Sequence, residues 1–246
     1  MKTVAIVQAR IGSTRLPGKV LMCIGGETTL GRVVRRLSRA KLITEVTIAT
    51  TDSPADDAIV SEANRLGVRC FCGSEQDVLA RYLGAAEEFE AEVIVRVTSD
   101  CPLIDAGVAD QVLQDFFQAR VDFAYNDVEH SFPRGLDVEA LSREALHKAA
   151  EIAERQYHRE HVTPIFYESP DLFRVAIVHA EKDYSRYRWT LDTSDDLQLI
   201  REIYRHFSDR DNFTWRDVVA LMEQSPELAR INAHIVQKSG HEVAAS

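Results

Sequence analysis

Residues able to bind a polyanion gather in one short stretch near the N-terminus, immediately after an apolar run at residues 4–7. Backbone N–H groups and hydroxyls can hold phosphate oxygens, and Arg and Lys add charge-assisted hydrogen bonds. The stretch from Gln8 to Lys19 supplies three cations, two hydroxyls and two glycines: Arg10, Gly12, Ser13, Thr14, Arg15, Gly18 and Lys19. This composition predicts a binding site for a polyanion. The alternative is a basic loop whose glycines and proline serve only as turn residues.

The stretch does not match two common phosphate-binding motifs. A Walker A loop has four residues between its glycines and Ser or Thr after its lysine, whereas here five separate Gly12 from Gly18 and Val20 follows Lys19. The spacing also differs from G-x-G-x-x-G. The spacing of this stretch therefore favours neither hydrolysis by a P-loop enzyme nor dinucleotide binding.

Composition narrows the possible partners. The chain has 246 residues and a formal net charge of -10, from 29 basic and 39 acidic residues. An acidic surface disfavours nucleic acids and anionic membranes, because binding phosphate backbones needs clustered Lys and Arg. No apolar run approaches the ~20 residues of a membrane span, and the start lacks the layout of a cleavable signal peptide. The four cysteines lack zinc or C-x-x-C spacing, which favours reduced thiols and a cytoplasmic protein.

Strands and helices are expected to alternate in the first half of the chain, which predicts an α/β fold with a doubly wound, mostly parallel sheet. In such folds, ligands bind at the carboxyl ends of the strands. The expected strands are 4–7, 46–49, 68–72, 93–98 and 121–125, and the expected helices are 29–39, 53–66, 74–89 and 105–119.

The regular alternation of expected strands and helices ends after residue 126. Strands are expected at 132–140, 173–178 and 188–192, and helices at 143–154, 156–167, 195–207 and 214–223. We expect a single domain over 1–246, with a nucleotide-binding core (1–125), an acceptor-binding or dimerisation insertion (about 126–190) and closing helices (191–246).

The string A-I-V-Q-A-R-I-G-S-T-R-L-P-G-K (residues 5–19) resembles the signature of cytidylyltransferases such as the CMP-KDO and CMP-sialate synthetases. The similarity is strongest to the branch of spore-coat polysaccharide and flagellin-glycan proteins. Further blocks match in order across about residues 2–205: F-C-G-S, D-V-L-A-R-Y, R-V-T-S-D-C-P-L-I, G-L-D-V-E, R-E-H-V-T-P and R-W-T-L-D. The resemblance implies a nucleotide-diphosphosugar-transferase-like (Rossmann-like) fold and transfer of CMP from CTP to a sugar acid, with release of pyrophosphate.

The resemblance assigns catalytic roles to Arg15, Lys19, Asp100 and Asp192. Asp100 and Asp192 would be the Mg²⁺ ligands, in keeping with the preference of Mg²⁺ for one or two carboxylates plus phosphates and waters. Each aspartate could instead cap a helix. The implied nucleotide-binding set is Gln8, Ala9, Arg10, Gly12, Ser13, Arg15, Lys19, Gly73, Ser74, Arg81 and Asp100. Gly73 and Ser74 could also be only a turn from strand to helix.

The resemblance places the acceptor against later residues: Arg134, Asp137, Glu139, His161 and Arg188. Two of these are permanent cations, which suits a carboxylate on the acceptor. His161 could equally be structural. A histidine–glycine stretch typical of CMP-KDO synthetases is absent from the sequence, so a different sugar acid, or another hydroxylated or phosphorylated acceptor, stays open. The resemblance also implies a homodimer, which members of the family often form.

Three other functions stay open. A glycosyltransferase of similar fold would need a D-x-D metal motif, and Asp209-Arg210-Asp211 is the one such triplet in the sequence, between two expected helices. An inactive nucleotide-binding subunit is disfavoured by the presence of Lys19, Asp100 and Asp192. A nucleotidyltransferase that uses UTP or GTP would differ only in base recognition.

Overall fold

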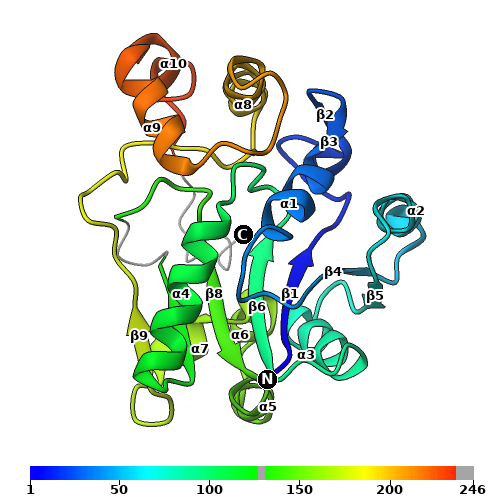
Figure 1. Cartoon of the computed structure of the whole chain (residues 1–246). Helices are drawn as coiled ribbons and strands as arrows, with labels where there is room; N and C mark the ends of the chain where they lie inside the picture. Colours follow the sequence, from blue (N-terminus) through cyan, green and yellow to red (C-terminus); the bar gives the residue numbers. More distant parts are fainter. Residues whose placement is uncertain (127–130, 237–246) are drawn as a thin grey trace.

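A seven-stranded sheet organises the chain in a computed structural model that describes residues 1–126 and 131–236. The strand order is β5-β4-β1-β6-β8-β7-β9, and neighbours are parallel except that β8 is antiparallel to both β6 and β7 (Figure 1). The predicted α/β fold with a mostly parallel sheet is thereby confirmed. The strands are β1 Thr3–Gln8, β4 Glu45–Thr51, β5 Cys70–Gly73, β6 Val93–Thr98, β7 Phe123–Tyr125, β8 Glu139–Ser142 and β9 Val175–Ile177.

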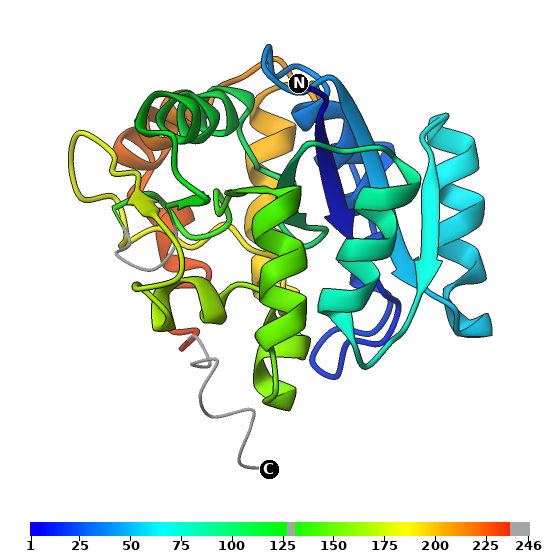
Figure 2. The ribbon, with the colours of Figure 1, turned by 90° about the horizontal axis from the view of Figure 1, so that it is seen from below.

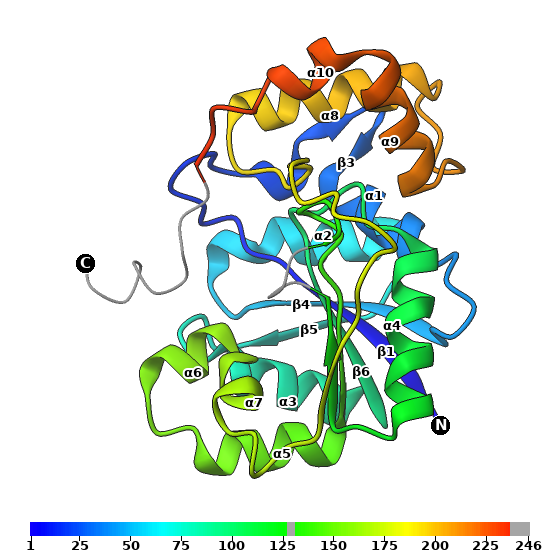
Figure 3. The ribbon, with the colours of Figure 1, turned by 90° about the vertical axis from the view of Figure 1, so that its left-hand side faces the viewer.

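The two faces of the sheet bury separate apolar clusters, because side chains alternate along each strand. Ala5 and Val7 join one cluster, and Val4 and Ile6 join the other. The first cluster is covered by α1 Thr29–Leu37, α2 Asp57–Leu66, α4 Ala106–Ala119, α8 Ser194–His206 and α9 Trp215–Gln224. The second is covered by α3 Val78–Glu88, α5 Arg143–Ile152 and α7 Pro164–Glu168. Figure 3 shows α1 and α2 above the sheet and α3, α5 and α7 below it, and Figure 2 views this lower side.

The strand predicted at 132–140 is wrong for most of its length, since β8 spans Glu139–Ser142. Pro133 has no backbone N–H, and Gly135 has a φ of +99°, which an extended strand does not accommodate. The strand predicted at 188–192 is also absent. Among the described residues, the segment 188–192 makes a single β-type backbone pairing, an isolated bridge from Arg188 to Arg134.

The helix predicted at 156–167 is two short helices, α6 Gln156–His161 and α7. Val162 separates them with a φ of +69°. Pro164, which has no backbone N–H to continue the ladder of α6, is the first residue of α7. Four short elements were not predicted: the 3₁₀-helix Lys19–Leu21, strands β2 Cys23–Ile24 and β3 Glu27–Thr28, which form a hairpin, and helix α10 Pro226–Arg230.

The parallel strands β1, β4, β5 and β6 end at one edge of the sheet, where the stretch after β1 also begins. The last ten residues of the predicted closing region, 237–246, lie outside the described residues. Within the described part of the chain, no helix combines the length and apolar character needed to cross a bilayer. All four cysteines are free thiols.

Candidate active site

A polar cleft of about 600 Å³ lies at the carboxyl edge of the parallel strands. Its walls come from the stretch after β1, the end of β6, the turn into α3, and α6, which lies below the sheet edge in Figure 3. The cleft is lined by Gln8, Ala9, Arg10, Gly12, Ser13, Thr14, Arg15, Lys19, Val20, Glu75, Gln76, Val78, Arg81, Arg96, Thr98, Ser99, Asp100, Gln156, Glu160, His161 and Asp192.

Local hydrogen bonds fold residues 9–19 into a cradle. Ile11 N donates to Asp56 Oδ1 at 2.7 Å, and Gly18 N donates back to Ile11 O at 3.2 Å. Gly18 has a φ of +70°, a conformation that favours glycine, and the short 3₁₀-helix Lys19–Leu21 follows it. The cradle therefore presents its basic and hydroxyl side chains to one cleft.

The ammonium group of Lys19 joins the carboxylates of Asp100 and Asp192. Lys19 Nζ lies 2.6 Å from Asp100 Oδ2 and 2.8 Å from Asp192 Oδ1. Burial opposes the charge of Lys19, but the two carboxylates outweigh it and raise the Lys19 pKa. Burial likewise opposes the charge of Asp192, and Lys19, Arg188 and Arg15 outweigh it and hold the Asp192 pKa below its usual value.

Main-chain and side-chain contacts position both carboxylates. Asp100 follows β6, and its Oδ1 accepts from Thr98 Oγ1 at 2.6 Å. Asp192 precedes α8, and its Oδ2 lies 3.0 Å from Arg15 Nη2 and 2.7 Å from Arg188 Nη2. The capping alternative for Asp192 does not describe the structure, because Thr193 is the N-cap of α8.

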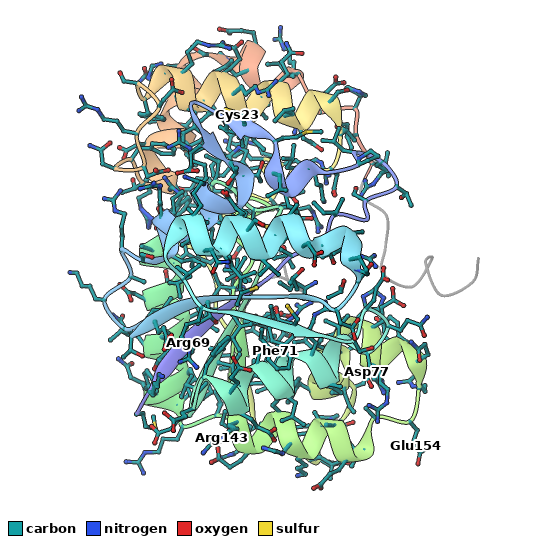
Figure 4. All side chains as sticks on the ribbon, turned by 90° about the vertical axis from the view of Figure 1, so that its right-hand side faces the viewer. Cys23, Arg69, Phe71, Asp77, Arg143 and Glu154 are labelled. Carbon is teal, nitrogen blue, oxygen red and sulfur yellow. The ribbon has the colours of Figure 1, made fainter. Side chains whose placement is uncertain are left out.

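Gly73 and Ser74 form the turn from β5 into α3 and are outside the set of residues that line the cleft. A Cβ on Gly73 would lie 2.8 Å from the ring of Phe71, which is packed between β5 and α3 (Figure 4). Ser74 Oγ accepts from the N–H of Asp77, the N-cap of α3. The contacts of Gly73 and Ser74 are therefore those of a turn from strand to helix.

Arg81 is 3% exposed and lines the cleft from α3. It donates to Ser74 O, but its Nε has no hydrogen-bond partner, and no carboxylate pairs with it among the described residues. Burial, aided by the nearby charge of Arg10, lowers the Arg81 pKa. A buried cation without an ion pair is costly unless a ligand supplies acceptors.

Of the five predicted acceptor residues, His161 lines the cleft and the other described members do not. Glu139 is buried and pairs with Arg96, which does line it. Asp137 accepts from Gly135 N at 3.2 Å, and burial raises its pKa to about 6. Arg134 and Arg188 connect two backbone segments through their β-bridge.

Sequence reasoning missed several lining residues on β6 and α6. Arg96 and Thr98 alternate with Asp100 along the chain, so the period of two placed them on the face of β6 that carries the site. Their polar types within an otherwise apolar strand were the available signal. Gln156 and Glu160 precede His161 in the sequence but carried no comparable signal.

The D-x-D triplet makes structural contacts away from the cleft. Asp211 Oδ2 lies 2.9 Å from Arg32 Nη1, and its Oδ1 accepts from Tyr204 Oη at 3.0 Å. The side chain of Asp209 packs at Gly25, in the β2–β3 turn. The two aspartates of the D-x-D triplet, which would be the metal ligands of a glycosyltransferase, therefore make structural contacts instead.

The model of the family described as cytidylyltransferase matches residues 4–218. The chain belongs to the cytidylyltransferase family. It is a nucleotidyltransferase enzyme, as the resemblance implied. This cytidylyltransferase is 32% identical to the spore coat polysaccharide biosynthesis protein SpsF of Bacillus subtilis, over 91% of the chain and 95% of that protein. It is 34% identical to the 3-deoxy-manno-octulosonate cytidylyltransferase of Geobacter sulfurreducens over 46% of the chain and 44% of that protein.

Solved structures agree with this membership. A cytidylyltransferase from Leptospira borgpetersenii superposes with a TM-score of 0.90 at 34% identity, covering 97% of this chain and all of that one. A CMP:2-keto-3-deoxy-manno-octonic acid synthetase complexed with CTP superposes with a TM-score of 0.64 at 19% identity, covering 84% of this chain and all of that one. The second comparison supports the fold alone.

Proposed function

We propose that this cytidylyltransferase transfers CMP from CTP to a sugar acid or a related hydroxylated acceptor, with Mg²⁺, in the synthesis of a surface polysaccharide or glycan. The observation that supports this proposal most is the contact of Lys19 with both Asp100 and Asp192, beside a basic cradle in one cleft. The names of the SpsF and octulosonate cytidylyltransferase relatives support the acceptor class and the pathway.

The donor set fits Mg²⁺. Two carboxylates reach the same ammonium group, so their oxygens already converge on one small cation. Among residues 1–126 and 131–236, no group of three or more His, Cys, Asp or Glu is placed to hold a metal ion. Mg²⁺ would take its remaining ligands from phosphates and water. Bound by Asp100 and Asp192, Mg²⁺ would neutralise negative charge on the phosphates of CTP.

The cradle supplies the contacts to the triphosphate. When CTP enters, Lys19 and Arg15 exchange carboxylate contacts for phosphate contacts, and Arg10 and Ser13 bind further oxygens. The acceptor hydroxyl gives up its proton to water as its oxygen forms a bond to the α-phosphorus, and the bond from this phosphorus to the pyrophosphate oxygen breaks. Positioning and charge neutralisation, rather than a covalent enzyme intermediate, account for such transfers.

The opposite end of the cleft, near α3, is suited to the nucleoside. Arg81 offers donors that lack a carboxylate partner among the described residues, and Gln8 Oε1 is a buried acceptor without a hydrogen-bond partner there. Backbone at Ala9, Gly73 and Ser74 would frame the base. His161 and Arg96 then face the acceptor, with Asp137, Glu139, Arg134 and Arg188 supporting them from behind.

The net charge of -10 supports small-molecule partners without nucleic acid or membrane. The four free thiols support a location in the cytoplasm. We propose a homodimer through the region that contains β9, because β9 is an edge strand that exposes Ile177, and Leu172 is exposed in the turn before it.

Isothermal titration of the purified protein with CTP, UTP, ATP and GTP, in Mg²⁺ and in EDTA, tests the proposal. Selective, Mg²⁺-dependent CTP binding, followed by pyrophosphate release with a sugar acid, is the expected result. Preference for another triphosphate would change the base assignment, and affinity for a nucleotide-sugar alone would overturn the reaction. An Asp100→Asn variant should lose turnover, whereas Asp195→Asn, at an exposed carboxylate, should keep it.

A further inference from the structure

A buried polar network lies behind Asp192, on the side away from Lys19. Asp196 is fully buried, and its Oδ1 lies 3.1 Å from Arg188 Nε. Its Oδ2 accepts from the N–H of Asp192 at 3.0 Å and from the N–H of Thr193 at 2.9 Å. One carboxylate thus holds both the backbone of Asp192 and the guanidinium that contacts its side chain.

Asn232 completes the network from a distant part of the chain. Its side chain is buried, and Nδ2 donates to Arg188 O at 2.9 Å and to Asp196 Oδ1 at 2.8 Å. Both partners can only accept, so the amide nitrogen must face them. Asn232 lies beyond residue 218, where the match to the family model ends.

The network determines how Asp192 presents its two oxygens. Arg188 Nη2 binds Oδ2 at 2.7 Å, beside the contact of 3.0 Å from Arg15, which leaves Oδ1 directed at Lys19 Nζ and hence toward Asp100. Rotation of the carboxylate would break the Arg188 contact, and movement of Arg188 would leave a buried charge without its partners.

We propose that Asn232 and Asp196 are positioning residues, which act through Arg188 to hold Asp192 Oδ1 toward the cation and CTP. The proposal rests on the proposed function, because it assumes that Asp192 is a Mg²⁺ ligand. Partners that orient metal ligands typically change metal affinity about 10- to 100-fold when they are removed. Asn232 thereby makes the segment after α10 part of the active site.

The test compares Asn232→Ala with His234→Ala. His234 lies in the same segment but makes an exposed pair with Asp195, so its variant controls for loss of a contact at the surface. Asn232→Ala should raise the Mg²⁺ concentration for half-maximal CTP binding about tenfold. CTP binding in EDTA should stay unchanged in both variants, and His234→Ala should match wild type in Mg²⁺.

A double-mutant cycle separates positioning from general packing. In an Asp192→Asn background, Asn232→Ala should no longer change the affinity for CTP in Mg²⁺. An equal effect with and without Asp192, or a variant indistinguishable from His234→Ala, would overturn the inference. If Asn232→Ala does not fold, Asn232→Ser provides the same comparison, since its hydroxyl has one donor hydrogen in place of the two that reach Arg188 O and Asp196 Oδ1. Wild-type protein that binds CTP without regard to Mg²⁺ would instead overturn the proposed function itself.

Discussion

The backbone N–H of Leu191 donates to the backbone carbonyl of Asp100 at 2.8 Å. Thr190 Oγ1 also donates to this carbonyl, at 3.3 Å. These bonds join the end of β6 to the segment that precedes α8, although the two are distant in sequence. The distance between the carboxylates of Asp100 and Asp192 is therefore fixed by main-chain contacts as well as by Lys19.

Replacing Lys19 with Ala should weaken CTP binding by about 1.5–3 kcal/mol, the scale of a hydrogen bond to a charged group. The variant also leaves the carboxylates of Asp100 and Asp192 without their shared cation. Calorimetric titration with CTP in Mg²⁺ measures the loss, and Lys41→Ala, at an exposed lysine, is the matched control. Equal affinities in the two variants would remove Lys19 from the triphosphate site.

Replacing Arg81 with Met should separate stability from binding. The variant removes a buried cation that lacks a carboxylate partner among the described residues, so the free energy of unfolding should stay the same or increase. Affinity for CTP should fall, because the ligand loses a donor. Urea unfolding and CTP titration together give the answer; a destabilised variant with normal CTP affinity would make Arg81 purely structural.

Replacing Gly135 with Ala should destabilise the protein by roughly 1–3 kcal/mol, the usual cost of overpacking. The new Cβ would lie 2.7 Å from the backbone nitrogen of Thr190, at a φ of +99°. Gly12→Ala is the control for stability, because nothing lies within 4 Å of its new Cβ. Thermal unfolding of both variants checks the prediction. Turnover should fall with Gly135→Ala, since the strained segment leads to Asp192.

Stability should depend on the ionisation of Asp137. Burial raises its pKa to about 6 in the folded protein, above the ordinary value of about 3.9. The folded state therefore holds the proton more tightly, and the stability that this adds is complete below about pH 4 and is lost as the pH rises through 6. The loss is on the order of 3 kcal/mol.

An Asp137→Asn variant should lack this dependence and gain stability relative to wild type between pH 4 and 7. Urea unfolding at pH 4.5, 5.5 and 7 measures the difference, with Asp195→Asn as the surface control. If the free energy of unfolding changes with pH in the same way for Asp137→Asn and wild type, Asp137 is not the group that causes the pH dependence.

The cradle and the core strands were predictable because their signals are local. Val4–Val7 is a continuous apolar run, as expected of a strand covered on both faces, and Lys19 belongs to a dense group of cations and glycines. Asp100 follows a strand whose apolar run is equally clear. Their meeting with Asp192 followed from the resemblance, since no local pattern joins residues so far apart.

The later region was predicted less well because tertiary contacts override its local pattern. The break at Val162 lies in a residue that rarely adopts a positive φ, although Pro164 was a usable sign that the helix ends. The role of Arg188 depends on Asp196 and Asn232, and nothing in the sequence indicates that these residues meet. Its charge suggested a ligand for the acceptor, whereas its contacts in the structure are with the protein.

The antiparallel direction of β8 has a consequence for how the enzyme can diversify. β7 ends at Tyr125 and β8 begins at Glu139, and both of these ends lie at the cleft edge because β8 runs opposite to its neighbours. The described part of the connection packs Phe132 and Leu136 into the core and joins Arg134 to Arg188, in the segment that leads to Asp192. Substitutions in the described part of this connection would therefore change that edge of the cleft, while the parallel pairing of β1 with β6 stays the same.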